Sequence, residues 1–228
     1  MHDDPERSTL AQPRHEVSVR IGRGAGAVRL AQHPRASHKP YVRRSVVARQ
    51  LRRHVITYQD VCRANDQVTR ELYNLGFWSD RINKVNVYWM AASWRCYGWY
   101  LNHIYIPAIT GAQLSDLISG RHTRLTDVLR HEWAHAVADR HDGLMDTKRF
   151  VRDFGGPYES ADAVHDYDPD RHLTEYAATM PCEDFAEVFH YYLRHKGRLP
   201  VRLADKPRVV RKWQFVKWLA KSISSGAL

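Results

Sequence analysis

Cysteine is scarce in this chain, and long apolar runs are absent from it. The 228 residues include only Cys62, Cys96 and Cys182, and no C-x-x-C pair occurs. A small, odd number of cysteines indicates a reducing compartment or incidental thiols rather than a disulfide framework. The missing pair argues against a ribbon-type zinc site. No stretch approaches the roughly 20 apolar residues of a membrane span, so no span is expected.

The N-terminus also lacks the features of a secretory signal. Met1–Arg7 is polar, and no apolar segment follows it. A signal peptide needs an apolar core after its charged start. The expected location is therefore the cytoplasm, with export by a route that uses no signal peptide left open.

Positive charge is concentrated at the start of the chain. Residues 1–54 hold 12 Lys/Arg and 4 Asp/Glu, whereas the remaining 174 residues hold 23 and 21. We therefore divide the chain into a basic, partly disordered extension, residues 1–54, and one folded domain, residues 55–228. The extension is interpreted as a contact with nucleic acid or another anionic surface, as a removable pro-segment, or as a solvated tail. Alternating apolar residues over 16–31 predict a small β-hairpin inside it.

The spacing of apolar residues predicts the elements of the folded domain. Alternation predicts strands over residues 84–90, 93–101 and 103–107, with a turn at Asn102. Spacings of three and four predict helices over residues 60–75, 112–118, 123–140 and 206–222, the first of them ended by Gly76. Between the third helix and the next predicted helix, residues 142–173 are expected to form a connector rich in carboxylates.

The most informative segment is His131-Glu132-Trp133-Ala134-His135, which reads H-E-x-x-H within the predicted helix over 123–140. Residues four apart lie near one another on a helix surface, so His131 and His135 can direct two imidazoles at one ion. Glu132 lies beside them, where it can reach a water bound to that ion. Two imidazoles suit zinc, and a carboxylate next to the bound water suits hydrolysis.

A catalytic zinc usually has a third protein ligand, and the sequence offers two candidates. His141 gives the metzincin spacing, but Ala138 stands where metzincins have Gly. Glu183 lies in a predicted helix that Thr179 caps and Pro181 opens, and Glu187 follows it on the same face. Glu183 as ligand, with Glu187 as the partner of a ligand, accounts for two carboxylates beside an apolar stripe. We favour Glu183 and keep His141 as the alternative.

Two blocks of this sequence, about 131–139 and 173–193, resemble the catalytic domain of anthrax lethal factor and its bacterial relatives, which are gluzincin-type zinc metallopeptidases. The resemblance assigns His131, His135 and Glu183 as metal ligands and Glu132 as the general base. It also assigns Tyr176 as the group that stabilises the oxyanion, and Glu187 as a carboxylate that supports a ligand. Ala134 stands where the family usually has Gly.

The resemblance implies an α+β, two-lobed zincin-like fold with a small mixed sheet and an active-site helix that carries H-E-x-x-H. It implies a zinc-dependent endopeptidase with one catalytic Zn2+ and a protein or peptide substrate. In that architecture the last strand before the active-site helix is an edge strand that binds the substrate backbone, which assigns this role to residues 103–107. The rival hypotheses are a nucleic-acid-binding or structural protein with an inert zincin fold, and a peptidase that acts on nucleic-acid-bound proteins.

Overall fold

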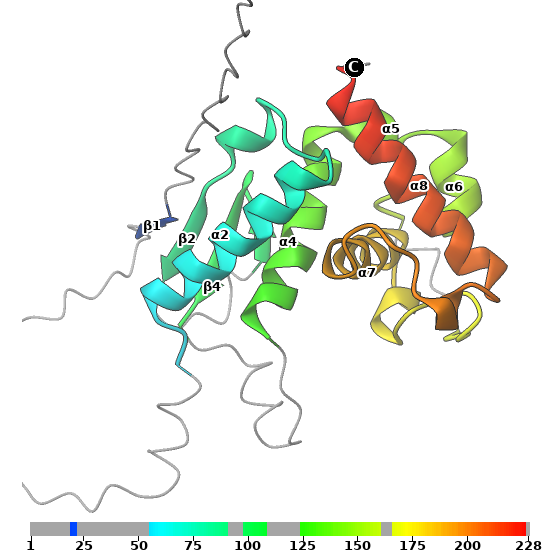
Figure 1. The fold of residues 1–228 in the computed structure, drawn as a ribbon, viewed down its shortest axis with the longest axis horizontal. Helices are drawn as coiled ribbons and strands as arrows, with labels where there is room; N and C mark the ends of the chain where they lie inside the picture. Colours follow the sequence, from blue (N-terminus) through cyan, green and yellow to red (C-terminus); the bar gives the residue numbers. More distant parts are fainter. Residues whose placement is uncertain (1–18, 22–54, 91–97, 109–123, 161–165, 227–228) are drawn as a thin grey trace, which may run out of the picture.

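The computed structural model describes residues 19–21, 55–90, 98–108, 124–160 and 166–226, and they form a mixed α+β fold (Figure 1). The strands are β1 (Val19–Ile21), β2 (Val87–Met90), β3 (Gly98–Tyr100) and β4 (His103–Pro107). The main helices are α2 (Tyr58–Asn74), α4 (Leu125–Arg140), α5 (Asp142–Met145), α6 (Lys148–Phe154), α7 (Pro181–Arg194) and α8 (Pro207–Ser224). Short 3-10 turns occur at Ile82–Lys84, Tyr176–Ala178 and Val201–Leu203. The predicted helix over residues 112–118 lies outside the described residues.

The four described strands form one sheet in the order β1-β2-β4-β3. β1, β2 and β4 are parallel, and β3 pairs antiparallel with β4. The prediction that residues 103–107 form an edge strand is therefore wrong, because β4 lies between β2 and β3. The reason is the turn at Leu101 and Asn102, whose φ angles are 47° and 66°. Two successive left-handed residues make a tight hairpin, which places β3 on the side of β4 that would otherwise be free.

β1 comes from the predicted N-terminal extension. Its residues Val19, Arg20 and Ile21 are in parallel register with Val87, Tyr88 and Trp89 of β2. The predicted second arm of the hairpin, near residues 28–30, lies outside the described residues. The pairing with β2 places three residues from the extension in the sheet of the folded domain.

α2 and α4 pack on one face of the sheet and join it to the remaining helices. α2 begins with a capping box, in which the Thr57 hydroxyl accepts a hydrogen bond from the Asp60 N–H, and the Asp60 carboxylate accepts one from the Thr57 N–H. Its buried stripe, with Val68 and Leu72 fully inaccessible, faces the core. Figure 1 shows α4 between the sheet and α7, so α4 has neighbours on both sides and its central turns are buried.

The predicted connector over residues 142–173 contains two helices, α5 and α6. The Thr147 hydroxyl caps α6 by accepting the Phe150 N–H, and Gly155 ends the helix with a φ of 89°. Phe150 and Phe154 are buried against Phe215 of α8, with ring centroids 5.5 and 5.4 Å away. A helix of 7 residues is too short to show a periodic pattern, so sequence spacing could not reveal it.

The other helices begin and end close to their predicted limits. α7 begins at Pro181 with Met180 as its N-cap, one residue later than the predicted Thr179. α8 continues to Ser224, beyond the predicted residue 222. Among the described residues, every helix is too short or too polar to cross a bilayer.

A buried ion pair joins α8 to α7. The side chains of Lys212 and Asp184 are only 1% and 2% exposed, and the Lys212 ammonium also donates to the Arg171 carbonyl oxygen, 2.6 Å away. Burial raises the pKa of Asp184 to about 6, against the opposing effect of Lys212. Because Asp184 follows Glu183 directly, this ion pair also fixes the turn of α7 that carries Glu183.

We expect Lys212→Met to destabilise the protein by about 3–5 kcal/mol, because it leaves the Asp184 carboxylate buried without its cation. Urea unfolding followed by circular dichroism measures this loss. Lys217→Met, on the exposed side of the same helix, is the control. The double change Lys212→Met with Asp184→Leu should recover most of the stability, because it removes both charges. Equal effects of Lys212→Met and Lys217→Met would contradict the prediction.

Candidate metal centre

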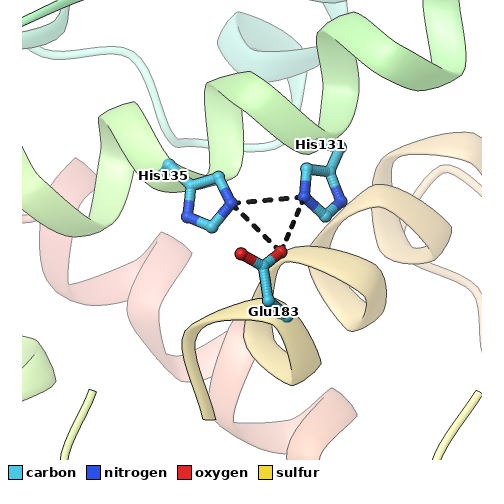
Figure 2. Close-up of side chains that lie close together, drawn as sticks. All are labelled: His131, His135 and Glu183. Carbon is cyan, nitrogen blue, oxygen red and sulfur yellow. Dashed lines mark hydrogen bonds and ion pairs between the residues drawn. The ribbon is translucent and has the colours of Figure 1, made fainter. Parts of the chain in front are cut away.

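Three side chains from α4 and α7 converge on one point (Figure 2). The His131 Nε2 atom lies 3.0 Å from Glu183 Oε2 and 3.2 Å from His135 Nε2. His135 Nε2 lies 3.5 Å from the same Glu183 oxygen. Among the described residues this is the group of three ligand-type side chains that could hold a metal ion, with all ligand atoms within 4.8 Å of one another.

The outer nitrogens of both imidazoles are engaged by oxygen atoms. His131 Nδ1 lies 3.0 Å from Glu187 Oε1, and His135 Nδ1 lies 3.0 Å from the Tyr158 hydroxyl. Histidines that bind a metal usually donate their other N–H to such an oxygen, which fixes the tautomer. The Nε2 atoms of both imidazoles and one oxygen of Glu183 are therefore directed at one position, where a metal ion would displace the proton that His131 Nε2 shares with Glu183. Two imidazole nitrogens and one carboxylate oxygen are a donor set that fits a metal ion.

Local helix geometry explains the convergence. His131 and His135 are separated by one turn of α4 and therefore lie on the same side of it. Glu183 lies in the first turn of α7, which Pro181 opens at a position where its missing N–H costs no hydrogen bond. α4 packs along α7, so the two helices bring the imidazoles and the carboxylate together.

Carboxylates dominate the electrostatics of the site. Burial alone would lower the pKa of His131, but its contacts with Glu183 and Glu187 outweigh burial and raise that pKa to about 10. Burial alone would likewise raise the pKa of Glu183, but hydrogen bonds with His131 and His135 hold it well below its ordinary value. Burial would also raise the pKa of Glu187, but hydrogen bonds with His131 and His190 lower it to about 2. Both carboxylates are therefore anionic at neutral pH, and their negative charge attracts a cation to the centre.

Glu132 is held by the edge strand β3. Its Oε2 atom accepts a hydrogen bond of 2.8 Å from the backbone N–H of Trp99, and the residue is 7% exposed. Gly98, next to it in β3, has a φ of 85°, and a Cβ atom there would lie 2.6 Å from Glu132 Oε2. The carboxylate therefore occupies space that only a glycine leaves free. Both residues of β3 position the group assigned as the general base.

On the hypothesis that Glu132 is a general base, we expect Gly98→Ala to lower turnover about 100-fold, because a displacement of about 1 Å in a reacting group can cost that much. The new methyl group must push the Glu132 carboxylate away, whereas His131 and His135 are not touched. Metal content should stay unchanged. Gly143→Ala, where a Cβ meets nothing within 4 Å, is the control. Metal loss in Gly98→Ala, or turnover equal to that of Gly143→Ala, would contradict this role.

Glu187 connects the first histidine to a buried polar network. Its Oε1 atom contacts His131, and its Oε2 atom accepts a hydrogen bond of 3.1 Å from the Thr174 hydroxyl. Behind it, His190 Nδ1 lies 3.9 Å from Glu187 Oε1, and His190 Nε2 lies 3.3 Å from Asp127 Oδ1. Glu187 therefore contacts the His131 ring on the side opposite Glu183, and its role as the partner of a metal ligand stays a prediction.

We expect Glu187→Gln to weaken metal binding about 10- to 100-fold, the usual effect of removing the partner of a metal-binding histidine. Competition with a fluorescent chelator measures the dissociation constant. Glu175→Gln, an exposed carboxylate just before the Tyr176–Ala178 turn, is the control. An unchanged dissociation constant in Glu187→Gln would mean that His131 is oriented without it.

Tyr176 stands at the mouth of the centre. Its ring centroid lies 5.7 Å from that of His131, and 52% of the residue is exposed. Burial of the hydroxyl and the nearby Glu183 carboxylate raise its pKa above the ordinary value. The phenol therefore keeps its proton at neutral pH and can donate a hydrogen bond to an anionic oxygen.

His141 lies apart from the three convergent side chains. It follows α4 directly, is 1% exposed, and its Nε2 atom lies 3.3 Å from the Ser79 hydroxyl. Burial lowers its pKa to about 4, helped by the positive charge of Arg81. A neutral, buried imidazole that contacts Ser79 has a structural role at the end of α4. The geometry therefore favours Glu183 over His141 as the third ligand.

The three ligand-type residues open into a cavity of about 970 Å³. Glu132, Trp99 and Tyr176 line it near the centre. Beyond His135, its wall carries four carboxylates from the connector and the end of α4: Asp139, Asp142, Asp146 and Glu159. The cavity is large enough for several residues of a peptide.

Two contacts at this site are not predictable from the sequence. Tyr158 lies in the connector, and its ring packs on Phe150 of α6 and Phe185 of α7, which places its hydroxyl 3.0 Å from His135 Nδ1. Trp99 belongs to a predicted strand, but the hydrogen bond from its N–H to Glu132 joins residues 33 positions apart. Neither residue belongs to a recognisable spacing, so no sequence signal could have identified these roles.

Comparison with known proteins gives no relative. No protein-family model matches the chain, and no curated protein or solved structure is significantly similar to it. The site must therefore be interpreted from its own geometry.

Proposed function

We propose that this protein is a zinc-dependent endopeptidase. The observation that carries the proposal is the convergence of His131, His135 and Glu183 at the wall of a large cavity, with Glu132 beside them. Catalytic zinc sites commonly combine two histidines with one glutamate and keep one position open. The zincin-like fold and the kinship with the lethal factor catalytic domain belong to the same proposal. The sheet with α2 and α4 would form one lobe, and α5 to α8 the other.

Zinc is the metal that this donor set suits best. Two imidazole nitrogens and one carboxylate oxygen favour a borderline cation, whereas magnesium and calcium favour sites made of oxygen atoms. When bound, zinc lowers the pKa of a water molecule and polarises the peptide carbonyl. The support from Glu187 and Tyr158 behind the two histidines fixes the orientation that such a site requires.

The chain's own residues supply the proton transfers. Trp99 holds one carboxylate oxygen of Glu132, which leaves the other to take a proton from the attacking water. Glu132 then delivers that proton to the amine that leaves. Tyr176, protonated at neutral pH, donates a hydrogen bond to the oxyanion as charge develops on it.

Metal analysis combined with a peptide-library digest tests the proposal. The full chain should contain about one zinc per molecule, as a three-ligand catalytic site binds one ion. It should also cleave internal peptide bonds in the library. A chelator should abolish cleavage, and added zinc should restore it. Stoichiometric zinc without any cleavage would support the inert-fold alternative, and a protein that binds no zinc would refute both.

A further inference from the structure

A second charged feature of the molecule lies in its C-terminal part. Residues 55–194 hold 14 Lys/Arg and 20 Asp/Glu, whereas residues 195–228 hold 9 Lys/Arg and 1 Asp/Glu. The net charge of +8 in this last segment contrasts with −6 in the part that carries the cavity. This excess of positive charge lies in α8 and in the residues just before it, and it is separate from the basic segment 1–54.

α8 separates its apolar and cationic side chains onto two faces. The buried face packs on α6 and α7 and includes Trp213, Phe215, Val216 and Leu219. The exposed face carries Arg208, Arg211, Lys217 and Lys221, and the helix contains no carboxylate. In Figure 1, α8 lies in the helical part, on the side of α4 away from the sheet.

Most of these cations are not neutralised. Arg208 lies 3.8 Å from Asp168, but in the described part of the chain no ion pair involves Arg211, Lys217 or Lys221. Arg149 of α6 extends the row, because its guanidinium lies 4.7 Å from the centroid of the Trp218 ring; like Arg208, it has a carboxylate nearby, with Asp153 at 3.9 Å. Gln214 lies on the exposed side between Arg211 and Lys217. We call this set of cations and Gln214 the α8 face.

We propose that the α8 face binds the phosphate backbone of a nucleic acid. Arginine, lysine and glutamine are among the side chains that contact phosphates in such complexes. An 18-residue helix is about 27 Å long, and each strand of a duplex presents a phosphate about every 3.4 Å, so the row spans several phosphates. None of the residues that line the cavity belongs to α8, so this surface is separate from the candidate metal centre.

The same features argue against a membrane as the partner. A helix that binds a bilayer inserts an apolar face between the lipid headgroups. The apolar face of α8 is already buried against α6 and α7, and none of its described residues is a large exposed apolar side chain. The helix therefore offers charge and hydrogen bonds without an inserting surface.

Salt-dependent binding of a mixed-sequence DNA duplex to the full chain tests the proposal. The triple change Arg211→Gln, Lys217→Gln and Lys221→Gln removes three cations of the α8 face. The matched control Arg63→Gln, Arg70→Gln and Lys84→Gln removes three exposed cations elsewhere. Because both proteins keep residues 1–54 and the same net charge, only the position of the removed charges differs.

We expect the α8 triple variant to bind DNA at least about 10-fold more weakly than the control at low salt. The slope of log affinity against log salt should become less steep by about 0.9 for each phosphate that the variant no longer neutralises. The single changes Arg211→Gln and Lys221→Gln should each give about a third of the slope change. An unchanged circular dichroism spectrum and thermal midpoint in every variant show that the fold is retained.

Two results would overturn the proposal. One is an equal decrease of DNA affinity in the α8 triple variant and the control. The other is binding to vesicles of phosphatidylserine and phosphatidylcholine that depends on the α8 face, together with no binding to DNA. Neither result bears on whether the candidate metal centre hydrolyses peptides, which the metal and digest experiment decides separately.

Discussion

Glu132→Gln is expected to abolish peptide hydrolysis and to leave the metal bound. Glutamine keeps the size of the side chain, and its amide oxygen can still accept the Trp99 N–H that holds Glu132. The other end of the side chain becomes an amide, which cannot take a proton from water. Loss of a general base costs about 100- to 10,000-fold, so the residual rate should be at or below detection.

Cleavage of a peptide chosen from the library measures the rate, and elemental analysis of the same sample measures zinc. His131→Ala is the comparison, because it removes an assigned ligand and should lose zinc. Equal zinc loss in Glu132→Gln and His131→Ala would exclude the general-base role for Glu132. Activity retained in Glu132→Gln would exclude it as well.

Glu183→Ala is expected to lose the metal, whereas His141→Ala should keep it. Glu183 Oε2 lies within 3.5 Å of the ligand nitrogens of both His131 and His135, whereas His141 contacts Ser79. Without Glu183, only two imidazoles remain to bind the metal. The dissociation constant of the metal should therefore rise more than the roughly 100-fold that can follow the loss of a hydrogen-bond partner such as Glu187. Dialysis against a chelating buffer followed by elemental analysis measures the difference.

The opposite outcome has a definite meaning. If His141→Ala strips the metal and Glu183→Ala retains it, the metal lies between His131, His135 and His141, and the metzincin spacing describes the site. The comparison needs a folding check by circular dichroism, because His141 is buried and its loss opens a small cavity. Because Glu183 is partly exposed, the Glu183→Ala protein should fold normally.

The candidate metal centre and the α8 face carry opposite charges. The cavity wall carries carboxylates, and the α8 face carries cations, so a protein bound to nucleic acid could contact both surfaces. A peptidase with these two surfaces would meet its substrate on the nucleic acid, which is one of the rival hypotheses raised by the sequence. The digest and the DNA experiment test these surfaces independently of each other.

Local patterns determined the elements that carry the candidate site. The pairing of His131 with His135 depends only on the helical repeat, so the sequence alone predicts that both face one point. The stripes that bury α2, α7 and α8 follow the same repeat, and these helices lie within a few residues of their predicted limits. Glu183 and Glu187 could be singled out as candidates because they are four apart on one helix, beside an apolar stripe.

The tertiary structure decided everything that depends on distant segments meeting. The choice between Glu183 and His141 required the packing of α7 on α4, and the edge position of β3 required the turn at Leu101 and Asn102. The contacts of Trp99 with Glu132 and of Tyr158 with His135 join residues far apart in the chain. Such contacts arise from the packing of whole elements, which no spacing within one segment encodes. The sequence therefore specified which side chains could bind a metal, and packing decided which of them meet.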